Sequence, residues 1–310
     1  MEMEAVAKSL LETNRVQAAL IQALWKGHGS VVRYTAPDGH SLVMKHVELR
    51  QDDSEADEGV ERKRTSYIVE RAFYDRFSSR LPSSSCRVPR LLAMGSSYLA
   101  LEDLIDFPVR VNRIERHEQR PILSRVVKWL AEFHAVFLGE PKAQQGELWE
   151  CGTYLALATR QQELAGMDDS SFLKRRAAEF DAKLREDDSI MSLVHGDAKL
   201  ANFCFSSDLQ SVAGLDFQYV GRGCGVQEVV YLVANGVKDE KLALEWSDSI
   251  FDEYFSALIS NSVDQDKVER MRALVPFAAA DYLRFLRGWA PHRGAQPFLE
   301  KLVAPILSKE

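Results

Sequence analysis

The sequence of 310 residues has no apolar run that approaches the roughly 18 residues a membrane span needs. Its first residues, Met1-Glu2-Met3-Glu4, are acidic, whereas a secretory signal peptide begins with basic residues. No C-x-x-C spacing occurs, so neither a disulfide framework nor a zinc site is indicated for the four cysteines, Cys86, Cys151, Cys204 and Cys224. We therefore expect a cytoplasmic protein with reduced thiols and no membrane partner.

The sequence has fewer basic than acidic residues. The chain has 39 basic and 46 acidic residues and a formal net charge of −7, so we expect no broad cationic surface and no nucleic-acid partner. Its 46% hydrophobic and 27% charged residues exclude disorder as the main state. The length allows one large domain or two lobes, and nothing in the sequence indicates an obligate protein partner.

The N-terminal part of the chain favours a small sheet with flanking helices. Apolar positions recur at helical spacing, without Gly or Pro, over Met3–Trp25, which predicts a helix there. The charged stretch Arg50–Arg64 is predicted to be a mobile connection. Turn residues at Pro37-Asp38-Gly39 and Gly95-Ser96-Ser97 predict two hairpins, with strands at 31–35 and 41–47 and at 91–94 and 98–101.

One carboxylate stands out in the helix predicted over Ser66–Leu81. The apolar side chains of this helix gather on one face, and Glu70 falls within that face. A carboxylate in an apolar seam is costly unless a cation meets it, so we expect a basic partner from another element. Lys45, in the middle of the strand at 41–47, is the expected partner.

Helices dominate after about residue 105. Pro121–Leu138 has Pro at its start and Gly139 after its end, as is typical of an amphipathic helix. The pattern predicts short strands at 193–194, 202–205 and 212–217, and helices at 226–235, 241–258, 264–287 and 298–307. We expect an α+β fold with an N-terminal lobe at 1–105, a helical lobe at 106–310 and a hinge near 101–107.

Two acids and an amide have the spacing of a phosphoryl-transfer site. Asp197 precedes Asn202 by five positions in the segment His195–Asn202, and Asp216 follows in Leu215-Asp216-Phe217-Gln218. Asp216 and Asn202 offer oxygen ligands for Mg²⁺. Asp197 can orient an attacking hydroxyl and accept its proton, which predicts a catalytic role.

The N-terminal lobe offers the matching nucleotide contacts. Lys45, held by Glu70, would meet the α- and β-phosphates as a point charge. Gly27 and Gly29 would let the backbone lie close over the phosphates, and Ser30 would add a donor. These residues predict a site for ATP, with Mg²⁺ as its metal, between the two lobes.

These motifs resemble those of the kinase-like phosphotransferases, which include aminoglycoside phosphotransferases, choline kinases and ecdysteroid kinase-like proteins. The resemblance covers roughly residues 25–235 and rests on the catalytic-loop motif at 195–202 and the metal-binding motif at 215–218. It implies a two-lobed protein-kinase-like fold with a small antiparallel-sheet lobe and a larger, mostly helical lobe. It also implies transfer of the γ-phosphate of ATP to a hydroxyl of a small molecule. Glu102 and Leu104 fall in the segment that resembles the adenine-binding hinge.

The acceptor pocket is expected in the helical lobe. Tyr282 and Trp289 lie at helical spacing beside Asp281, and such aromatic and acidic walls would suit a cationic or amphipathic alcohol. Gln218, at the end of the second motif, is a further candidate contact. Glu228 stands where the family usually has the Asp that braces the catalytic loop. Choline-like, aminoglycoside-like, sterol-like and other natural-product alcohols all remain open as acceptors.

Two other functions are weighed against a kinase. A catalytically silent kinase-like protein would hold nucleotide or a partner, but silence usually shows as loss of the Lys or of one of the two Asp residues, and all three are present. A metal-dependent hydrolase could use His195 with Asp197, but the cluster of His and carboxylate ligands of such sites is missing from the sequence. We expect His195 to hold its loop by packing and hydrogen bonding.

Overall fold

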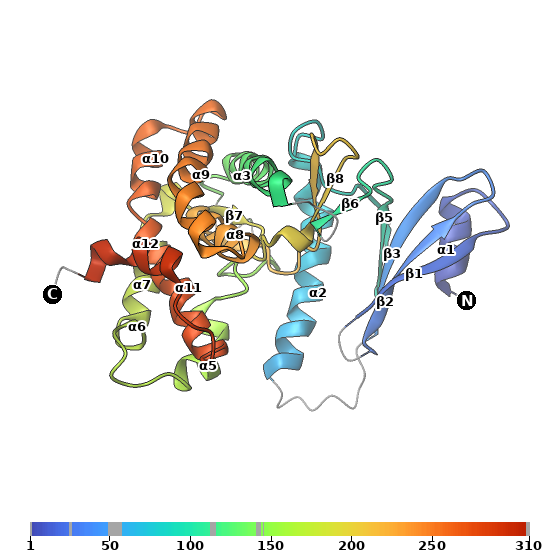
Figure 1. Ribbon diagram of the computed structural model, residues 1–310. Helices are drawn as coiled ribbons and strands as arrows, with labels where there is room; N and C mark the ends of the chain where they lie inside the picture. The colour runs from blue at the N-terminus through green and yellow to red at the C-terminus, as the bar shows by residue number, and fades with distance from the viewer. Residues whose placement is uncertain are drawn as a thin grey trace.

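A computed structural model describes residues 2–24, 27–48, 58–111, 116–140, 144 and 146–307. A five-stranded sheet lies at one end of the molecule and a group of helices at the other, with the termini far apart (Figure 1). Helix α2 (Glu58–Arg76) stands between these two parts. It is therefore placed to connect them.

The sheet is antiparallel, with strands in the order β1-β2-β3-β5-β4. Both predicted hairpins are confirmed, one formed by β2 and β3 and the other by β4 and β5. Gly39 in the first turn has a φ of +91°, a conformation that glycine adopts without strain. The strands are β1 (Gln17–Ala23), β2 (Gly29–Thr35), β3 (Ser41–Val47), β4 (Leu91–Met94) and β5 (Tyr98–Glu102).

The prediction of one helix over Met3–Trp25 is wrong. The chain forms α1 (Glu2–Leu10) and then β1, and position 25 lies outside the described residues. The helix ends because Glu12 adopts a φ of +49° and the backbone N–H groups at 12 and 13 bond back to the carbonyls of Ser9 and Lys8. Beyond this end, β1 gains backbone pairing with β2, which outweighs the helical spacing of its exposed side chains.

Helix α2 is longer than the sequence pattern indicated. Residues 58–64 are helical, so the mobile connection predicted over Arg50–Arg64 is wrong for this part, and positions 50–57 lie outside the described residues. The regular helix ends at Arg76, and a 3-10 turn follows at Ser78–Arg80. Phe73 and Tyr74 of α2 pack into the main hydrophobic core.

The helical region is built around α3 (Gln119–Val136), which buries its apolar face and matches the helix predicted at 121–138. The helices predicted at 226–235, 241–258 and 298–307 are confirmed. The segment at 264–287 forms two helices, because Pro276 suits the first turn of a new helix and could not continue an existing one. The helices are α5 (Gln161–Ala165), α6 (Phe172–Arg175), α7 (Ala177–Arg185), α8 (Val226–Gly236), α9 (Glu240–Ser260), α10 (Gln265–Arg272), α11 (Val275–Trp289) and α12 (Pro297–Leu307). Within the described ranges, no helix has the length and apolar character to cross a membrane.

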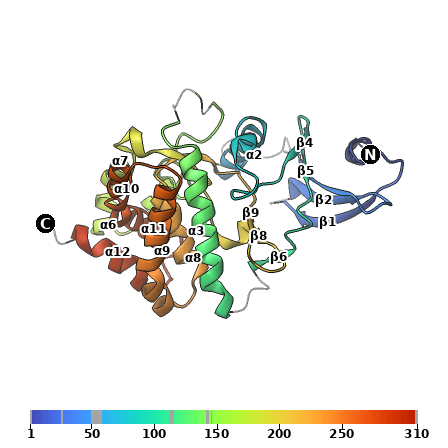
Figure 2. The ribbon, with the colours of Figure 1, turned by 90° about the horizontal axis from the view of Figure 1, so that it is seen from above.

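Short strands carry the two motifs. β7 (Ser192–Val194) pairs with β10 (Gly221–Gly223), and β8 (Phe203–Phe205) pairs with both β6 (Val109–Arg110) and β9 (Val212–Gly214). Figure 2 shows β6, β8 and β9 between the helices and the large sheet. The segments at 195–202 and 215–220 leave these strands, so both motifs lie where the two parts of the molecule meet.

An aromatic cluster joins α2 and α3 to the second motif. Phe217 stacks on Phe73 of α2, with ring centroids 4.0 Å apart, and its ring lies 6.2 Å from that of Phe133 of α3. Trp129 stacks on Phe133 at 5.3 Å. All four side chains are buried. The residue next to Asp216 in the chain is thus anchored in the core.

Removing one ring of this cluster should destabilise the whole molecule. Phe73→Ala is expected to lower the free energy of unfolding by about 3–5 kcal/mol, because it removes the stacking partner of Phe217 and leaves a cavity. Urea unfolding followed by fluorescence measures this. Leu20→Ala, on the exposed face of β1, is the matched control and should change the value by no more than about 0.5 kcal/mol.

Candidate active site

A buried ion pair joins the sheet to α2, as predicted from the position of Glu70. Lys45 Nζ on β3 donates to Glu70 Oε2 at 2.6 Å, and the two residues are 9% and 3% exposed. Burial disfavours the charged ammonium, but the nearby carboxylates of Glu70 and Asp216 outweigh this and raise the pKa of Lys45. Lys45, in the central strand of the sheet, therefore stays charged.

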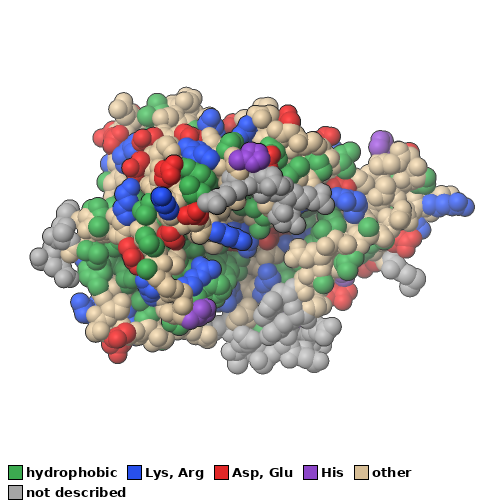
Figure 3. Space-filling model, in the orientation of Figure 1, with side chains coloured by type: hydrophobic (Ala, Val, Ile, Leu, Met, Phe, Trp, Pro, Cys, Tyr) green, Lys and Arg blue, Asp and Glu red, His purple; other side chains and the backbone are tan. Residues whose placement is uncertain are grey.

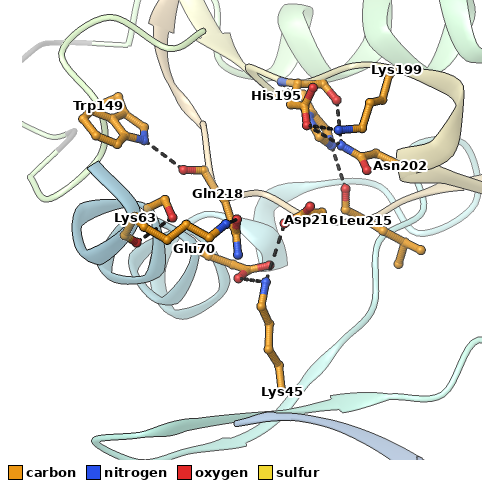
Figure 4. A network of polar contacts seen from close by, with 12 residues as sticks. Lys45, Lys63, Glu70, Trp149, His195, Lys199, Asn202, Leu215, Asp216 and Gln218 are labelled. Carbon is orange, nitrogen blue, oxygen red and sulfur yellow. Dashed lines mark hydrogen bonds and ion pairs between the residues drawn. The ribbon is translucent and has the colours of Figure 1, made fainter. Parts of the chain in front are cut away.

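Asp216 lies beside this pair (Figure 4). Lys45 Nζ is 3.6 Å from Asp216 Oδ1, which is buried and accepts no hydrogen bond within the described part of the chain. Its backbone has a φ of +64°, a left-handed conformation that few non-glycine residues adopt. Burial would raise the pKa of Asp216, but the charges of Lys45 and Lys63 outweigh burial and lower it. Asp216 is thus an ionised carboxylate with an oxygen that lacks a hydrogen-bond partner.

Asp197 lies in the loop between β7 and β8 and is surrounded by donors. Its Oδ2 accepts from Lys199 Nζ at 2.7 Å and from Asn202 Nδ2 at 3.0 Å. Its Oδ1 accepts from the hydroxyl of Tyr231 at 2.8 Å. Asn202 Nδ2 also donates to the backbone oxygen of Asp197. Both amide hydrogens of Asn202 are therefore used within the loop, and its Oδ1 is the atom left for a ligand.

The sequence reasoning missed Tyr231 as part of the site. Burial raises the pKa of Tyr231, and the charge of Asp197 raises it further, so its hydroxyl is protonated and donates to Asp197. Tyr231 follows Glu228 by three positions on α8, so the two share a helix face. That spacing was the signal that could have found it.

Glu228 braces the start of the same loop. Its carboxylate accepts the backbone N–H groups of His195 and Gly196 at 2.8 and 2.7 Å, and Oε2 lies 2.9 Å from His134 Nε2. His134 Nδ1 in turn lies 2.9 Å from the hydroxyl of Tyr254. Glu228 therefore holds the catalytic loop, although its side chain is one methylene longer than the Asp that is usual at this position. Gly196 has a φ of +85°, and a Cβ there would lie 1.9 Å from a backbone oxygen.

His195 joins the two motifs. Its Nε2 lies 2.9 Å from the backbone oxygen of Leu215, and its Nδ1 accepts from the backbone N–H of Asp197 at 3.3 Å. The ring also packs on Phe217 at 4.7 Å. Both ring nitrogens are used in these contacts, so the histidine fixes Asp197 and Asp216 relative to each other, as expected of a structural residue.

The predicted phosphate loop needs glycine for steric reasons, and the predicted hinge is held by an ion pair. Gly27 and Gly29 have φ values of +75° and +137°, and a Cβ on Gly29 would lie 2.0 Å from the backbone oxygen of His46, so only glycine fits there. Ser30 is the second residue of β2 and lies opposite His46 of β3. At the hinge, the carboxylate of Glu102 binds Arg87, the N–H of Glu102 donates to the carbonyl of Arg90 at 2.9 Å, and the carbonyl of Leu104 accepts from the N–H of Phe107 at 3.0 Å.

The predicted acceptor residues do not gather into one wall. Asp281 is 3% exposed and forms an ion pair with Arg284 at 2.6 Å, so it does not offer a free charge to a ligand. Tyr282 packs against Tyr231, with ring centroids 5.3 Å apart, and lies close to the Asp197 side of the cleft. Trp289 is 51% exposed. Gln218 is buried, and its Oε1 accepts from Lys63 Nζ at 2.7 Å.

A hollow in the surface runs between the sheet and the helices, with basic and hydrophobic side chains visible in it (Figure 3). Its position agrees with that of the two motifs at the junction of the two parts. The arrangement combines a paired lysine, an aspartate held by three donors, an amide oxygen and a second aspartate with a buried oxygen that accepts no hydrogen bond from the described residues. This set of groups suits phosphoryl transfer.

Fold and motifs together define a phosphotransferase with a two-lobed kinase-like architecture. The model of the phosphotransferase enzyme family matches residues 21–274, so the chain belongs to that family. No curated protein matches the chain significantly in sequence.

Three solved structures of such enzymes share the fold. Amicoumacin kinase in complex with AMP-PNP and Ca²⁺ superposes with a TM-score of 0.57, at 13% identity over 98% of this chain and 91% of that one. Choline kinase from Cryptosporidium parvum gives 0.57, at 9% identity over 98% and 92%. An aminoglycoside phosphotransferase from Streptomyces rimosus gives 0.54, at 15% identity over 90% and 99%. The predicted α+β, kinase-like fold is confirmed.

The brace formed by Glu228 can be tested by stability. Glu228→Ala leaves two buried N–H groups of the loop without an acceptor, so the free energy of unfolding should fall by about 2–5 kcal/mol. Urea denaturation provides the measurement. Glu147→Ala removes an exposed carboxylate that pairs with Arg76 at 3.3 Å and should cost about 1 kcal/mol at most. Equal effects of the two substitutions would contradict the brace.

Proposed function

We propose that this protein transfers the γ-phosphate of ATP, with Mg²⁺, to a hydroxyl of a small molecule. The observation that carries the proposal is the convergence of Lys45, Asp197, Asn202 and Asp216 from both parts of the molecule on one polar cluster. Membership of the phosphotransferase enzyme family supports the reaction type. The similar structures are named as an amicoumacin kinase, a choline kinase and an aminoglycoside phosphotransferase, which supports a small-molecule acceptor.

In this proposal the nucleotide lies between a lobe at 1–105 and a lobe at 106–310. The backbone at Glu102 and Leu104 receives the adenine, through groups other than the N–H of Glu102 and the carbonyl of Leu104, which bond to Arg90 and Phe107. Lys45, kept charged by Glu70, binds the α- and β-phosphates. Gly29 lets the backbone lie close over the phosphates, and Ser30 adds a hydroxyl donor.

The residues present fit a divalent metal. Asp216 Oδ1 is a buried carboxylate oxygen without a hydrogen bond, and Asn202 Oδ1 is left over after both amide hydrogens are used. Hard cations such as Mg²⁺ favour oxygen ligands of this kind. When bound, the metal would neutralise charge on the transferring phosphate. The similar amicoumacin kinase structure holds AMP-PNP and Ca²⁺, which supports a nucleotide and a divalent cation here.

Asp197 is proposed as the group that orients the acceptor hydroxyl and takes up its proton as the new O–P bond forms. Its three donors hold the carboxylate in one orientation, which is the main requirement for in-line attack. Lys199 is placed to balance its charge. Tyr231 and Tyr282 then form the nearest aromatic part of the acceptor side, while the buried Asp281–Arg284 pair does not supply a charge for a cationic acceptor.

The free state of all four cysteines fits the reducing cytoplasm, which is the proposed location.

Replacing Asp197 should stop transfer without unfolding the protein. A mass-spectrometric screen of hydroxylated metabolites with MgATP, in which a product gains one phosphoryl group, first identifies the acceptor. Asp197→Asn is then expected to reduce kcat by about 10³-fold or more, because the amide cannot accept the proton. Asp169→Asn, whose side chain is 94% exposed, should retain wild-type turnover. MgATP binding without transfer to any compound would favour the silent nucleotide-binding protein.

Replacing Asp216 should change the metal requirement. Transfer is expected to stop when EDTA removes divalent metal and to return with added Mg²⁺. Asp216→Asn keeps the size of the side chain but removes its charge, so the Mg²⁺ concentration for half-maximal transfer should rise by about tenfold or more. A titration of initial rate against Mg²⁺ gives the value. An unchanged titration curve would remove Asp216 from the metal site.

A further inference from the structure

Lys63 is a site residue that the two motifs do not include. It lies seven positions before Glu70 on α2, which is nearly two full turns, so the two side chains leave the same face of the helix. Lys63 Nζ donates to Gln218 Oε1 at 2.7 Å, two residues beyond Asp216. Figure 4 shows Lys63 reaching from α2 toward Gln218, close to Glu70 and Asp216.

The ammonium of Lys63 donates to a neutral amide, not to a carboxylate. No carboxylate oxygen of the described residues lies within 4.0 Å of Lys63 Nζ, and its hydrogen-bond partner is an amide. The centroid of the Tyr67 ring lies 5.2 Å from Lys63 Nζ and 5.7 Å from Lys45 Nζ, so both ammonium groups contact the same ring. Burial lowers the pKa of Lys63, and repulsion from Lys45 adds to this. The carboxylates of Asp216, Glu70 and Asp197 act on the pKa of Lys63 in the opposite direction.

The charges of the site balance without leaving an acid for Lys63. Glu70 is matched by Lys45, and Asp197 by Lys199. Asp216 remains, and its charge stabilises Lys63 only until a divalent cation binds that carboxylate. With the metal in place, Lys63 is an excess positive charge at the edge of the site, which calls for an anionic ligand.

From this position we propose that Lys63 binds the terminal phosphate of the nucleotide. The inference rests on the proposed function and adds to it a phosphate contact from α2. In the proposed function Lys45 binds the inner phosphates, whereas the Gln218 contact places Lys63 near Asp216, the residue that would hold a metal and so lie close to the transferring phosphate. An ammonium that exchanges a neutral amide for a phosphate oxygen gains a charge-assisted hydrogen bond.

Calorimetric titration of the acceptor-free protein with MgATP and with MgADP tests this contact. Lys63→Gln should weaken MgATP binding by about 10-fold to 100-fold and MgADP binding much less, so the preference for ATP over ADP should fall by about tenfold. Lys63→Arg keeps the charge and should stay within about fivefold of the wild type for MgATP.

Controls separate a binding role from a structural one. Arg76→Gln removes a cation from the last turn of the same helix, where the side chain is half-exposed, and should not alter either affinity. Thermal unfolding of the unliganded variants shows whether α2 remains folded. Equal loss of MgATP and MgADP affinity in Lys63→Gln, or an unchanged ATP preference, would overturn the inference while leaving the proposed function intact. A wild-type protein that binds neither nucleotide would refute the proposed function and this contact with it.

Discussion

The buried ion pair between Lys45 and Glu70 determines how the sheet and α2 lie relative to each other. Removing each charge from water is costly, and the cost is recovered only if the partners keep close geometry, here 2.6 Å. The same helix stacks Phe73 on Phe217, the residue next to Asp216. The packed core therefore sets the distance of 3.6 Å between Lys45 Nζ and Asp216 Oδ1.

The four acids of the site differ in what surrounds them, and this difference assigns their tasks. Glu70 is neutralised by Lys45, and Glu228 is used up by two backbone N–H groups and His134, so both are structural. Asp197 is held by three side-chain donors from two segments, which fix the orientation of its carboxylate. Asp216 alone has a buried oxygen without a hydrogen bond, which suits a cation.

The parts of the site that the sequence could predict are those that follow from local spacing or from the cost of burial. The loop motif is local, and Glu70 on an apolar face required a cation, which is Lys45. Tyr231 reaches Asp197 across 34 positions, and this contact depends on how α8 packs against the loop. The end of α1 was missed because a non-glycine residue, Glu12, adopts the left-handed conformation. The pairing of Asp281 was predictable from local spacing, because Arg284 lies three positions later on the same helix.

Helix α2 couples these features because one rigid element makes contacts in both directions. Glu70 binds the sheet, Phe73 packs on the second motif, and Lys63 reaches Gln218 in the helical part. Lys63 and Glu70 share a face, so a rotation of α2 that breaks the ion pair also carries Lys63 away from Asp216. An anion held between Lys45 and Lys63 would oppose such a rotation. In the proposed function, nucleotide binding and the alignment of Asp216 with the sheet are therefore linked through the position of a single helix.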